Sequence, residues 1–347
     1  MRKRIAILLA LTLPVICALL TTQQAATAAP LEIKFATQNP TTAWIHPNGY
    51  VAWAKKMEVA TEGRIKVTIY PAQTLGKGTE FYDLVKSGIA DMVFGIPTST
   101  PRMFPLTEIF SLPLLGFQNA AQAGKIEWEL YKRFPALQAE YGEVQMLAMA
   151  ATGPFFMANI NRPVTKLDDL KGLKVRVPGG RPADAFKAAG AVPAMIPMPE
   201  VFISLEKGII DSATVPWEGP IGYLPLKAIK YWCMDWELYN VPFYVAMNRN
   251  TWKKIPEKDQ QAIMKVWGDY GSEGFSRAVW DDSMSPAMKI IEENKIQVVK
   301  ADPSEVARWR EMTKPINQSY IDELKPKKLP AQEIYDALRK MIQETSK

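Results

Sequence analysis

The chain alternates between short strand-like and helix-like segments, and this alternation limits it to folds in which helices pack on a sheet. Residues 31–36 alternate apolar and polar side chains, an amphipathic segment then runs to Gly63, and residues 64–70 alternate again. A helical segment at 79–87 ends at a glycine and precedes the strand-like residues 90–95. Glycine commonly ends helices because it adopts positive φ angles without strain. Strands separated by helices in this way predict a parallel or mixed sheet.

The same alternation returns in the second half of the chain. Strand-like residues 144–151, 173–177 and 209–215 are separated by helical segments, and the helix-glycine-strand passage at 206–211 resembles the one at 86–91. A glycine at the end of a helix before a strand is common enough to account for most of this likeness. A chain of 347 residues usually divides into two domains, and its 48% hydrophobic share supplies two cores. We therefore predict two α/β lobes.

The late part of the chain is helical and brings no further sheet of its own. Apolar residues recur at helical spacing from about 256 to 294, and the tail from Ser304 reads as two more amphipathic helices with a short strand, 296–299, before them. We expect these elements to pack back across both lobes.

The N-terminus has the pattern of a secretory signal peptide, residues 1–28. Arg2, Lys3 and Arg4 precede an apolar run at 5–20, and a polar stretch then closes with Ala-Thr-Ala at 26–28. The apolar run is shorter than the roughly 20 residues that a membrane-spanning helix needs, and no later segment is apolar for that long. The mature protein is predicted to be soluble and exported, and not embedded in a membrane.

Cysteine and charge narrow the class of protein further. Cys17 lies in the apolar run after Ile16, which is not the small residue that a lipoprotein cleavage site needs, so no lipid anchor is expected. Only Cys233 remains after processing, which excludes an internal disulfide. About half of the formal net charge of +6 leaves with the leader, and the remainder is spread along the chain. This pattern argues against a nucleic-acid partner.

One arginine stands at the end of a predicted strand, in the segment 171–180, Lys-Gly-Leu-Lys-Val-Arg-Val-Pro-Gly-Gly. Because side chains alternate along a strand, Arg176 points away from the face of Val175 and Val177. Proline and two glycines then end the strand beside an open turn. A guanidinium held there presents a planar pair of donors that fits a carboxylate. The alternative from the segment alone is a surface arginine in a loose ion pair.

Several passages together match a known family. They are Tyr-Pro-Ala-Gln-Thr-Leu-Gly at 70–76, Val-Lys-Ser-Gly-Ile-Ala-Asp-Met at 85–92, Asn-Arg-Pro-Val at 161–164, the strand of Arg176, and Asp-Ser-Ala-Thr-Val-Pro at 211–216. In their order and spacing, from about residue 33 to 294, the chain resembles the DctP-type solute-binding proteins of TRAP transporters, the tripartite ATP-independent periplasmic systems.

The resemblance implies an α/β, two-lobed periplasmic binding protein fold, in which each lobe is a mixed sheet flanked by helices and a long helix spans both. Lobe I is expected to hold residues 29–152 and about 241–282, and lobe II residues 153–240 and about 283–347. It also implies a periplasmic protein that captures an organic carboxylate and passes it to the membrane permease of the transporter. Such a protein is not an enzyme. A binding protein of another transporter class is the nearest alternative.

The resemblance also assigns roles to single residues. Arg176 takes the position that pairs with the ligand carboxylate. Glu80 and Met198 match cleft positions, although Glu80 also suits a helix N-terminus and Met198 an apolar core. Val215 falls where several relatives carry an asparagine that helps to hold the carboxylate, so the second hydrogen-bond partner differs here.

The next residues bear on the nature of the ligand. Trp217 and Glu218 are similar to a Glu-Trp pair in the branch that binds 2-oxo acids together with a cation; the alternatives are a core tryptophan and a solvated acid at the hinge. A glutamate beside a carboxylate ligand is repulsive unless a cation, or an amine or hydroxyl of the ligand, lies between them. Glu218 is therefore a candidate ligand for a cation such as sodium, and no other cofactor is expected. Phe155, in the segment 153–156, replaces polar or cationic residues of some relatives. These changes favour a monocarboxylate, or a 2-oxo or 2-hydroxy acid, with an apolar or aromatic body.

An enzyme finds little support in the sequence. His46 is the only histidine, and the chain has no Gly-x-Ser-x-Gly elbow, zinc-ligand spacing or phosphate-binding loop. In the family the loop of His46 borders the cleft, so His46 is a candidate ligand contact, with an exposed loop histidine as the alternative. A periplasmic hydrolase that uses Asp and Glu alone stays open as a less favoured alternative, and a periplasmic chaperone would show exposed apolar patches that the mostly polar turns do not suggest.

Overall fold

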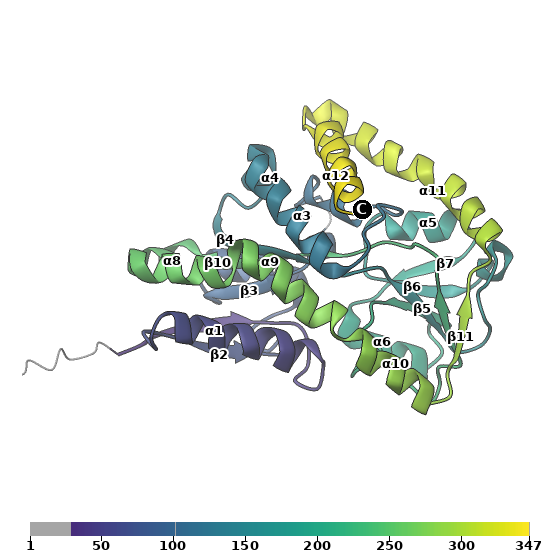
Figure 1. Ribbon diagram of the computed structural model, residues 1–347, viewed down its shortest axis with the longest axis horizontal. Coiled ribbons are helices and arrows are strands. Elements are labelled where there is room, and N and C mark those ends of the chain that lie inside the picture. Colours follow the sequence, from purple (N-terminus) through teal and green to yellow (C-terminus); the bar gives the residue numbers. More distant parts are fainter. Residues whose placement is uncertain (1–28, 101, 347) are drawn as a thin grey trace, which may run out of the picture.

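The computed structural model describes residues 29–100 and 102–346. These residues form two mixed sheets, each flanked by helices, which lie beside each other in the molecule (Figure 1). The predicted signal peptide, residues 1–28, lies outside the described residues. Among the described residues, no helix combines the length and apolarity that a bilayer crossing requires.

The first sheet builds lobe I, and its strand order is β2-β1-β3-β10-β4. The first three strands in sequence run parallel, whereas β10 runs antiparallel to both of its neighbours. The late strand β10 therefore returns the chain from lobe II into the centre of the first sheet. The strands are β1 (Leu31–Ala36), β2 (Ile65–Tyr70), β3 (Met92–Gly95), β4 (Val144–Ala151) and β10 (Pro242–Asn248).

Helices cover both faces of this sheet, and the amphipathic pattern of each explains which face is buried. In α3, for example, Ile126 and Leu130 are fully or almost fully buried, whereas Lys125 and Lys132 are exposed or half-buried at the surface. The helices of lobe I are η1 (His46–Val51), α1 (Ala52–Ala60), η2 (Gly78–Glu80), α2 (Phe81–Ser87), η3 (Pro97–Ser99), η4 (Thr107–Ser111), α3 (Ala120–Arg133), α4 (Pro135–Glu140), α7 (Arg249–Lys254), α8 (Glu257–Val266) and α9 (Gly268–Ser276).

The second sheet builds lobe II, and its strand order is β11-β9-β5-β8-β6-β7. Strand β6, which carries Arg176, lies between β8 and β7 and is parallel to both. The strands are β5 (Phe156–Asn159), β6 (Lys174–Val177), β7 (Val192–Met195), β8 (Ser212–Val215), β9 (Tyr231–Met234) and β11 (Gln297–Lys300); the helices beside them are η5 (Leu167–Leu170), α5 (Pro182–Ala188), η6 (Met198–Glu200) and α6 (Val201–Glu206).

Two segments without helix or strand, 152–155 and 235–241, join the lobes and are called the hinge segments here. They are hydrogen-bonded to each other: Thr152 donates its backbone N–H to the carbonyl of Val241 at 3.0 Å, and Phe155 donates to the carbonyl of Tyr239 at 3.1 Å. The hydroxyl of Thr152 also accepts from the backbone N–H of Val241 at 2.8 Å. This pairing makes the two crossings one ribbon rather than two independent linkers.

A run of helices also spans both lobes, as predicted, and crosses the molecule diagonally in Figure 1. It consists of α8, α9, the π-helical η7 (Arg277–Asp281) and α10 (Met284–Glu293). The run breaks at Gly268, which has a φ of 32°, a value in the left-handed region. Beyond this break, α9 packs on α3 and β4 of lobe I, and Ile291 of α10 packs in the core of lobe II.

The C-terminal helices, α11 (Pro303–Leu324), η8 (Lys325–Lys327) and α12 (Ala331–Thr345), form a second bridge. Trp309 of α11 is buried against Phe186 of lobe II, whereas Tyr320 near its end donates a hydrogen bond to the carbonyl of Pro105 in lobe I. Helix α12 then packs on α3 of lobe I. The last helix of the range that the sequence assigned to lobe II therefore lies on lobe I.

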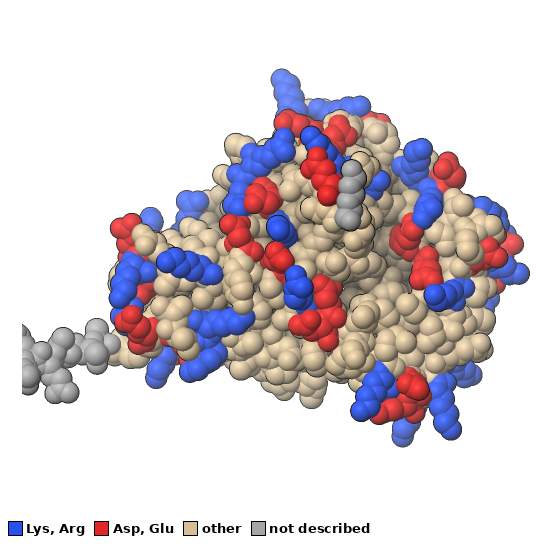
Figure 2. Space-filling model, in the orientation of Figure 1, with Lys and Arg blue, Asp and Glu red and all other residues tan. Residues whose placement is uncertain are grey.

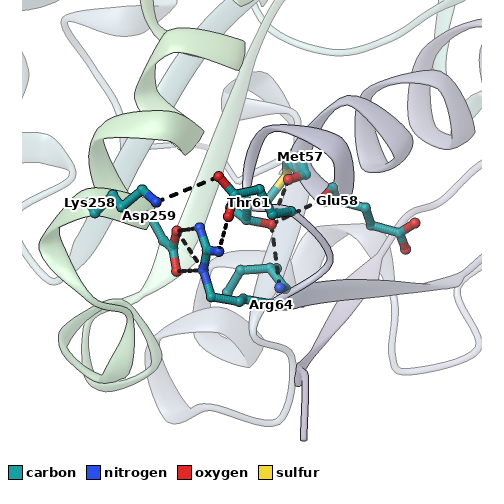
Figure 3. A network of polar contacts seen from close by, with 8 residues as sticks. Met57, Glu58, Thr61, Arg64, Lys258 and Asp259 are labelled. Atoms are coloured by element: carbon teal, nitrogen blue, oxygen red, sulfur yellow. Dashed lines mark hydrogen bonds and ion pairs between the residues drawn. The ribbon is translucent and has the colours of Figure 1, made fainter. Parts of the chain in front are cut away.

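A polar network fixes the start of the spanning helices to lobe I (Figure 3). Arg64 donates from Nε and Nη2 to the carboxylate of Asp259, with contacts of 3.0 and 2.7 Å, and Asp259 is almost fully buried. The Arg64 guanidinium holds the pKa of Asp259 below its usual range. Two parallel charge-assisted bonds of this kind set orientation as well as contact. They tie the first turn of α8 to the loop before β2.

Candidate ligand-binding site

A narrow cavity of about 40 Å³ lies between the two lobes. Lobe I and the spanning helices contribute Gln38, Asn39, Ile45, Ile96, Phe243 and Trp280; lobe II contributes Arg176, Pro178, Met198, Pro216 and Glu218; and Thr152, Phe155 and Val241 come from the hinge segments.

The lobes touch each other around this cavity, so the structure is a closed form. A side chain placed on Gly180 of lobe II would come within 3.0 Å of the Glu108 carboxylate of lobe I, and one placed on Gly179 would come equally close to the Thr98 carbonyl. On the other side, Gly222 approaches the backbone of residues 42–43 just as tightly. Closure thus leaves little space beyond the cavity itself.

Arg176 is held rigidly in the cavity wall and is only 3% exposed. Its Nε donates to the carbonyl of Ile196 at 2.7 Å, and its Nη1 donates to the carbonyl of Thr214 at 2.9 Å. Both carbonyls belong to segments that flank strand β6, so the sheet itself orients the guanidinium. The remaining donors of the planar fork are free for a ligand.

The charge of Arg176 has no protein counterion among the described residues, because none of their carboxylates lies within ion-pair distance of it. Burial lowers the pKa of Arg176 to about 10, so it still carries its charge at neutral pH. An uncompensated buried charge is costly unless a partner arrives. The site is therefore built to receive an anion.

Glu218 is the second ionisable group of the cavity and is 5% exposed. Its Oε1 accepts a hydrogen bond from Nε1 of Trp280 at 3.1 Å, whereas its Oε2 is buried and has no partner among the described residues. Burial raises the pKa of Glu218 to about 8, and the hydrogen bond from Trp280 opposes this only in part. At neutral pH the protonated acid predominates.

A chain of polar side chains connects the lobes near Glu218. Tyr50 of η1 donates to the side-chain oxygen of Asn39 at 2.6 Å, and the amide nitrogen of Asn39 donates to the hydroxyl of Tyr223, which belongs to lobe II. Asn39 lies in the loop just after strand β1, at the carboxyl edge of a parallel part of the sheet. Ligands of α/β proteins commonly meet polar residues at such edges.

Aromatic rings form much of the remaining wall. Phe155 stacks on Tyr239 at a centroid distance of 4.7 Å, and Phe243 stacks on Trp280 at 5.0 Å. Stacked pairs hold flat surfaces at fixed positions. The cavity thus combines one cation, one neutral acid and flat apolar walls.

The structure brings together four of the eight residues that the sequence nominated, Arg176, Glu218, Met198 and Phe155, and places the other four elsewhere. Glu80 is exposed, and its carboxylate accepts from the backbone N–H of Lys77, the role of a helix N-terminal acid. Val215 is fully buried in the core of lobe II. His46 is half-buried on η1 outside the cavity, and burial lowers its pKa.

Trp217 lies on the wall of a second, wider cavity behind the hinge segments. It packs against Phe156 and Trp232, with centroids 4.2 and 6.0 Å away. Phe155 lines both cavities, so its ring and that of Tyr239 separate them. Trp217 and Glu218 are therefore neighbours in sequence but face opposite sides of the hinge.

The sequence analysis missed several residues of the cavity. Gln38 and Asn39 carried a usable signal, because polar residues directly after a predicted parallel strand mark the edge where ligands bind. Trp280 and Phe243 gave none, since a tryptophan in a helix and a phenylalanine in a strand look like ordinary core.

The model of the DctP family, described as bacterial extracellular solute-binding protein, family 7, matches residues 35–324. The chain belongs to this family. A curated relative of this family 7 protein is the outer membrane transporter protein TsaT of Comamonas testosteroni, which is 26% identical over 309 residues and 88% of each chain. The prediction from the sequence that the chain is a DctP-type solute-binding protein of a TRAP transporter is confirmed.

Solved structures of TRAP solute-binding proteins share the fold of this family 7 protein. One from Rhodoferax ferrireducens, in complex with copurified benzoate, has a TM-score of 0.86 at 24% identity and covers 91% of this chain and 98% of its own. One from Bordetella bronchiseptica, with bound (R)- and (S)-mandelate, has a TM-score of 0.84 at 27% identity and covers 91% and 100%. The predicted two-lobed fold with a spanning helix is confirmed.

Proposed function

We propose that the protein captures a small organic carboxylate between its lobes, with Arg176 as the anchor of the carboxylate. The observation that carries the proposal is the buried guanidinium of Arg176, oriented by two backbone carbonyls and without a protein counterion among the described residues. Three of the five N–H donors of this guanidinium are free, and a parallel pair of them matches the two oxygens of a carboxylate.

The walls of the cavity favour a monocarboxylate with an apolar or aromatic body. Arg176 is the only Lys or Arg side chain among the residues that line it, so a second carboxylate would find no cation there. Phe155, Phe243 and Trp280 offer flat surfaces for a ring. The structures from Rhodoferax ferrireducens and Bordetella bronchiseptica, with benzoate and mandelate, support this class of ligand.

Closure of the lobes is the step that gives affinity. In an open form, Arg176 on lobe II would meet the ligand carboxylate in water, where an ion pair is weak. Closure brings Asn39, Phe243 and Trp280 of the other side onto the ligand and excludes water, which strengthens the ion pair. The free energy of the ligand contacts in turn stabilises the closed form.

The closed form is what we expect the TRAP membrane permease to recognise, in the periplasm after removal of residues 1–28. The protein acts as a binding component, so the ligand leaves it chemically unchanged. A thermal-shift screen of small carboxylates, followed by analysis of the recovered ligand, distinguishes binding from catalysis: a ligand raises the melting temperature and is recovered intact. Consumption of the ligand would favour a hydrolase instead.

Replacement of Arg176 tests the anchor directly. Arg176→Ala removes two charge-assisted hydrogen bonds and should weaken binding of the carboxylate about 100- to 1000-fold by calorimetry. Arg176→Lys should also bind weakly, because a point charge does not reproduce the paired donors. The matched control is Arg308→Ala, an exposed arginine that pairs with Glu305 on the same helix. An unchanged Kd in Arg176→Ala would contradict the proposal.

A further inference from the structure

Only one of the two carboxylate oxygens of Glu218 is hydrogen-bonded among the described residues. Glu218 lines the cavity; Trp280 donates to its Oε1, and its Oε2 is buried without a partner among the described residues. A buried polar atom without a partner is uncommon, and each such atom calls for an explanation in water or a ligand. Beside Arg176, Glu218 is therefore a second polar side chain of the cavity that can bond to a ligand.

The surroundings of Glu218 do not neutralise a negative charge. Tyr50 of η1 and Tyr223 of lobe II lie near it; burial raises the pKa of both hydroxyls, and an ionised Glu218 would raise both further. Asp281, which follows Trp280, is occupied by the backbone N–H groups of residues 120 and 121. The described ion pairs give Glu218 no cation, and Arg176 on the same wall forms none with it.

The charge balance of the closed complex depends on the proton of Glu218. With an ionised Glu218, the dry cavity would hold two carboxylates and one guanidinium, and the carboxylates would repel each other. With a protonated Glu218, the ligand and Arg176 compensate each other. Burial already favours the protonated state, since it raises the pKa of Glu218 to about 8.

We propose that Glu218 is a specificity-determining residue that enters the complex as a neutral acid and donates a hydrogen bond from its free oxygen to a second oxygen of the ligand. The inference rests on the proposed capture of a carboxylate at Arg176. It narrows the ligand class to carboxylates that also carry a hydroxyl or oxo group, such as 2-hydroxy and 2-oxo acids. A simple carboxylate leaves the Glu218 hydroxyl unpaired on closure, and the loss of that bond lowers its affinity.

Two matched acids test the specificity. Mandelate and phenylacetate share a ring and a carboxylate and differ in one hydroxyl, and calorimetry gives the Kd of each; lactate and propionate form a second pair. The wild-type protein should prefer the hydroxy acid at least tenfold, in line with one hydrogen bond to a buried acid. Glu218→Met removes the donor and should bring the ratio in that pair close to one. An equal ratio in the wild type and in Glu218→Met would overturn the inference.

Variation of pH tests the protonation state. Above pH 8, the wild-type Kd should rise about tenfold per pH unit, because an ionised Glu218 must take up a proton before the ligand binds. Measurements end at pH 9, one unit below the pKa of about 10 to which burial lowers Arg176, so that most of its charge is retained. Glu218→Gln still donates but does not titrate, so this dependence should disappear. Glu333→Gln, an exposed substitution on α12, should keep the wild-type profile.

The outcomes separate this inference from the proposed function. One outcome is that affinity for carboxylates depends on Arg176 but changes neither with Glu218 substitutions nor with pH. This would contradict the role of Glu218 and would leave the proposed capture of an anion at Arg176 standing. A requirement for sodium, seen as loss of binding when choline replaces it, would show that a cation neutralises Glu218 and would also overturn the neutral acid. If no acid of either pair binds, both proposals fail.

Discussion

Single residues define the chemistry of the site through the solvation of their charges. Arg176 and Glu218 are equally buried, but burial acts on them in opposite senses. Arg176 keeps its charge at neutral pH despite a pKa lowered to about 10, whereas Glu218, with a pKa raised to about 8, is mostly neutral. The difference follows from the reference values, since an ordinary arginine lies far above pH 7 and an ordinary glutamate far below it.

The buried Glu218 should also make the free protein less stable as the pH rises. In the unfolded chain Glu218 loses its proton near its ordinary pKa of 4.5, whereas the folded protein retains it up to about pH 8. The unfolded state is therefore favoured progressively between these values. Glu218→Gln, which does not titrate, should raise the melting temperature relative to the wild type more at pH 8 than at pH 5.

The control for this measurement is Glu333→Gln, whose effect on the melting temperature should be the same at both pH values because the side chain is exposed. A Glu218→Gln difference that stays constant between pH 5 and pH 8 would mean that Glu218 is ionised in the free protein at neutral pH.

At the scale of elements, the end of strand β6 does two tasks. It orients Arg176 through the sheet, and it then turns at Gly179 and Gly180, which have φ angles of 131° and 67°. These angles favour glycine. The same two glycines lie against Thr98 and Glu108 of lobe I, so the turn after the anchor strand is also a contact surface of closure.

A methyl group at Gly180 should hinder closure more than it harms folding. Its position would lie 3.0 Å from the Glu108 carboxylate across the cleft, so the closed form must shift to accommodate it. Strain of about 1–2 kcal/mol would weaken the Kd of the carboxylate about 5- to 30-fold. Gly172→Ala is the matched control, because Gly172 has a φ of 69° and no atom within 4 Å of the added group.

Both alanine variants should lose some melting temperature without ligand, since both have positive φ angles. Only Gly180→Ala should lose affinity in calorimetry. Equal affinities of the two variants would show that the Gly180 contact does not control closure.

At the scale of the whole molecule, the lobes are joined by more than the hinge segments. The run from α8 to α10 crosses between them, and α11 contacts Phe186 of lobe II and Pro105 of lobe I. Shared elements of this kind couple the stability of the two lobes. Closure is then a bending of a connected body rather than the meeting of two free domains.

Cys233 offers a probe of this coupling. It is buried in β9 of lobe II, and burial raises its pKa to about 12, so a thiol reagent should reach it only after lobe II opens. At a ligand concentration of 100 times Kd, labelling should slow about 100-fold, because ligand binding stabilises the closed protein by mass action. Labelling that is fast, or insensitive to ligand, would show that lobe II opens independently of the site.

Much of the fold followed from the sequence because its causes are local. Strands such as 31–36 and 144–151 show the residue pattern that a strand within a sheet requires. Glycines such as Gly88 end helices because they adopt positive φ angles without strain. Arg176 belongs to this class, since its strand and the turn after it are written in ten consecutive residues.

The rest of the site could not be predicted from the sequence, because it depends on the directions in which side chains point, and no local sequence pattern fixes these. Val215 points into the core of lobe II, whereas the hydroxyl of its neighbour Thr214 donates to the backbone carbonyl of Arg176. This alternation is fixed only once the register with β5 is known. Trp280 lies more than one hundred residues from Arg176 in sequence and reaches the cavity because the spanning helices cross both lobes.

The sequence by itself determined the alternating elements, the two lobes and one arginine at a strand end, because periodicity and backbone conformation act over a few residues. The tertiary structure decided that Arg176 is buried without a counterion and that Glu218 is neutral, because desolvation depends on everything that packs around a charge. It likewise decided that Trp217 and Glu218 line different cavities, since the other walls of both cavities come from segments that lie apart from them in sequence.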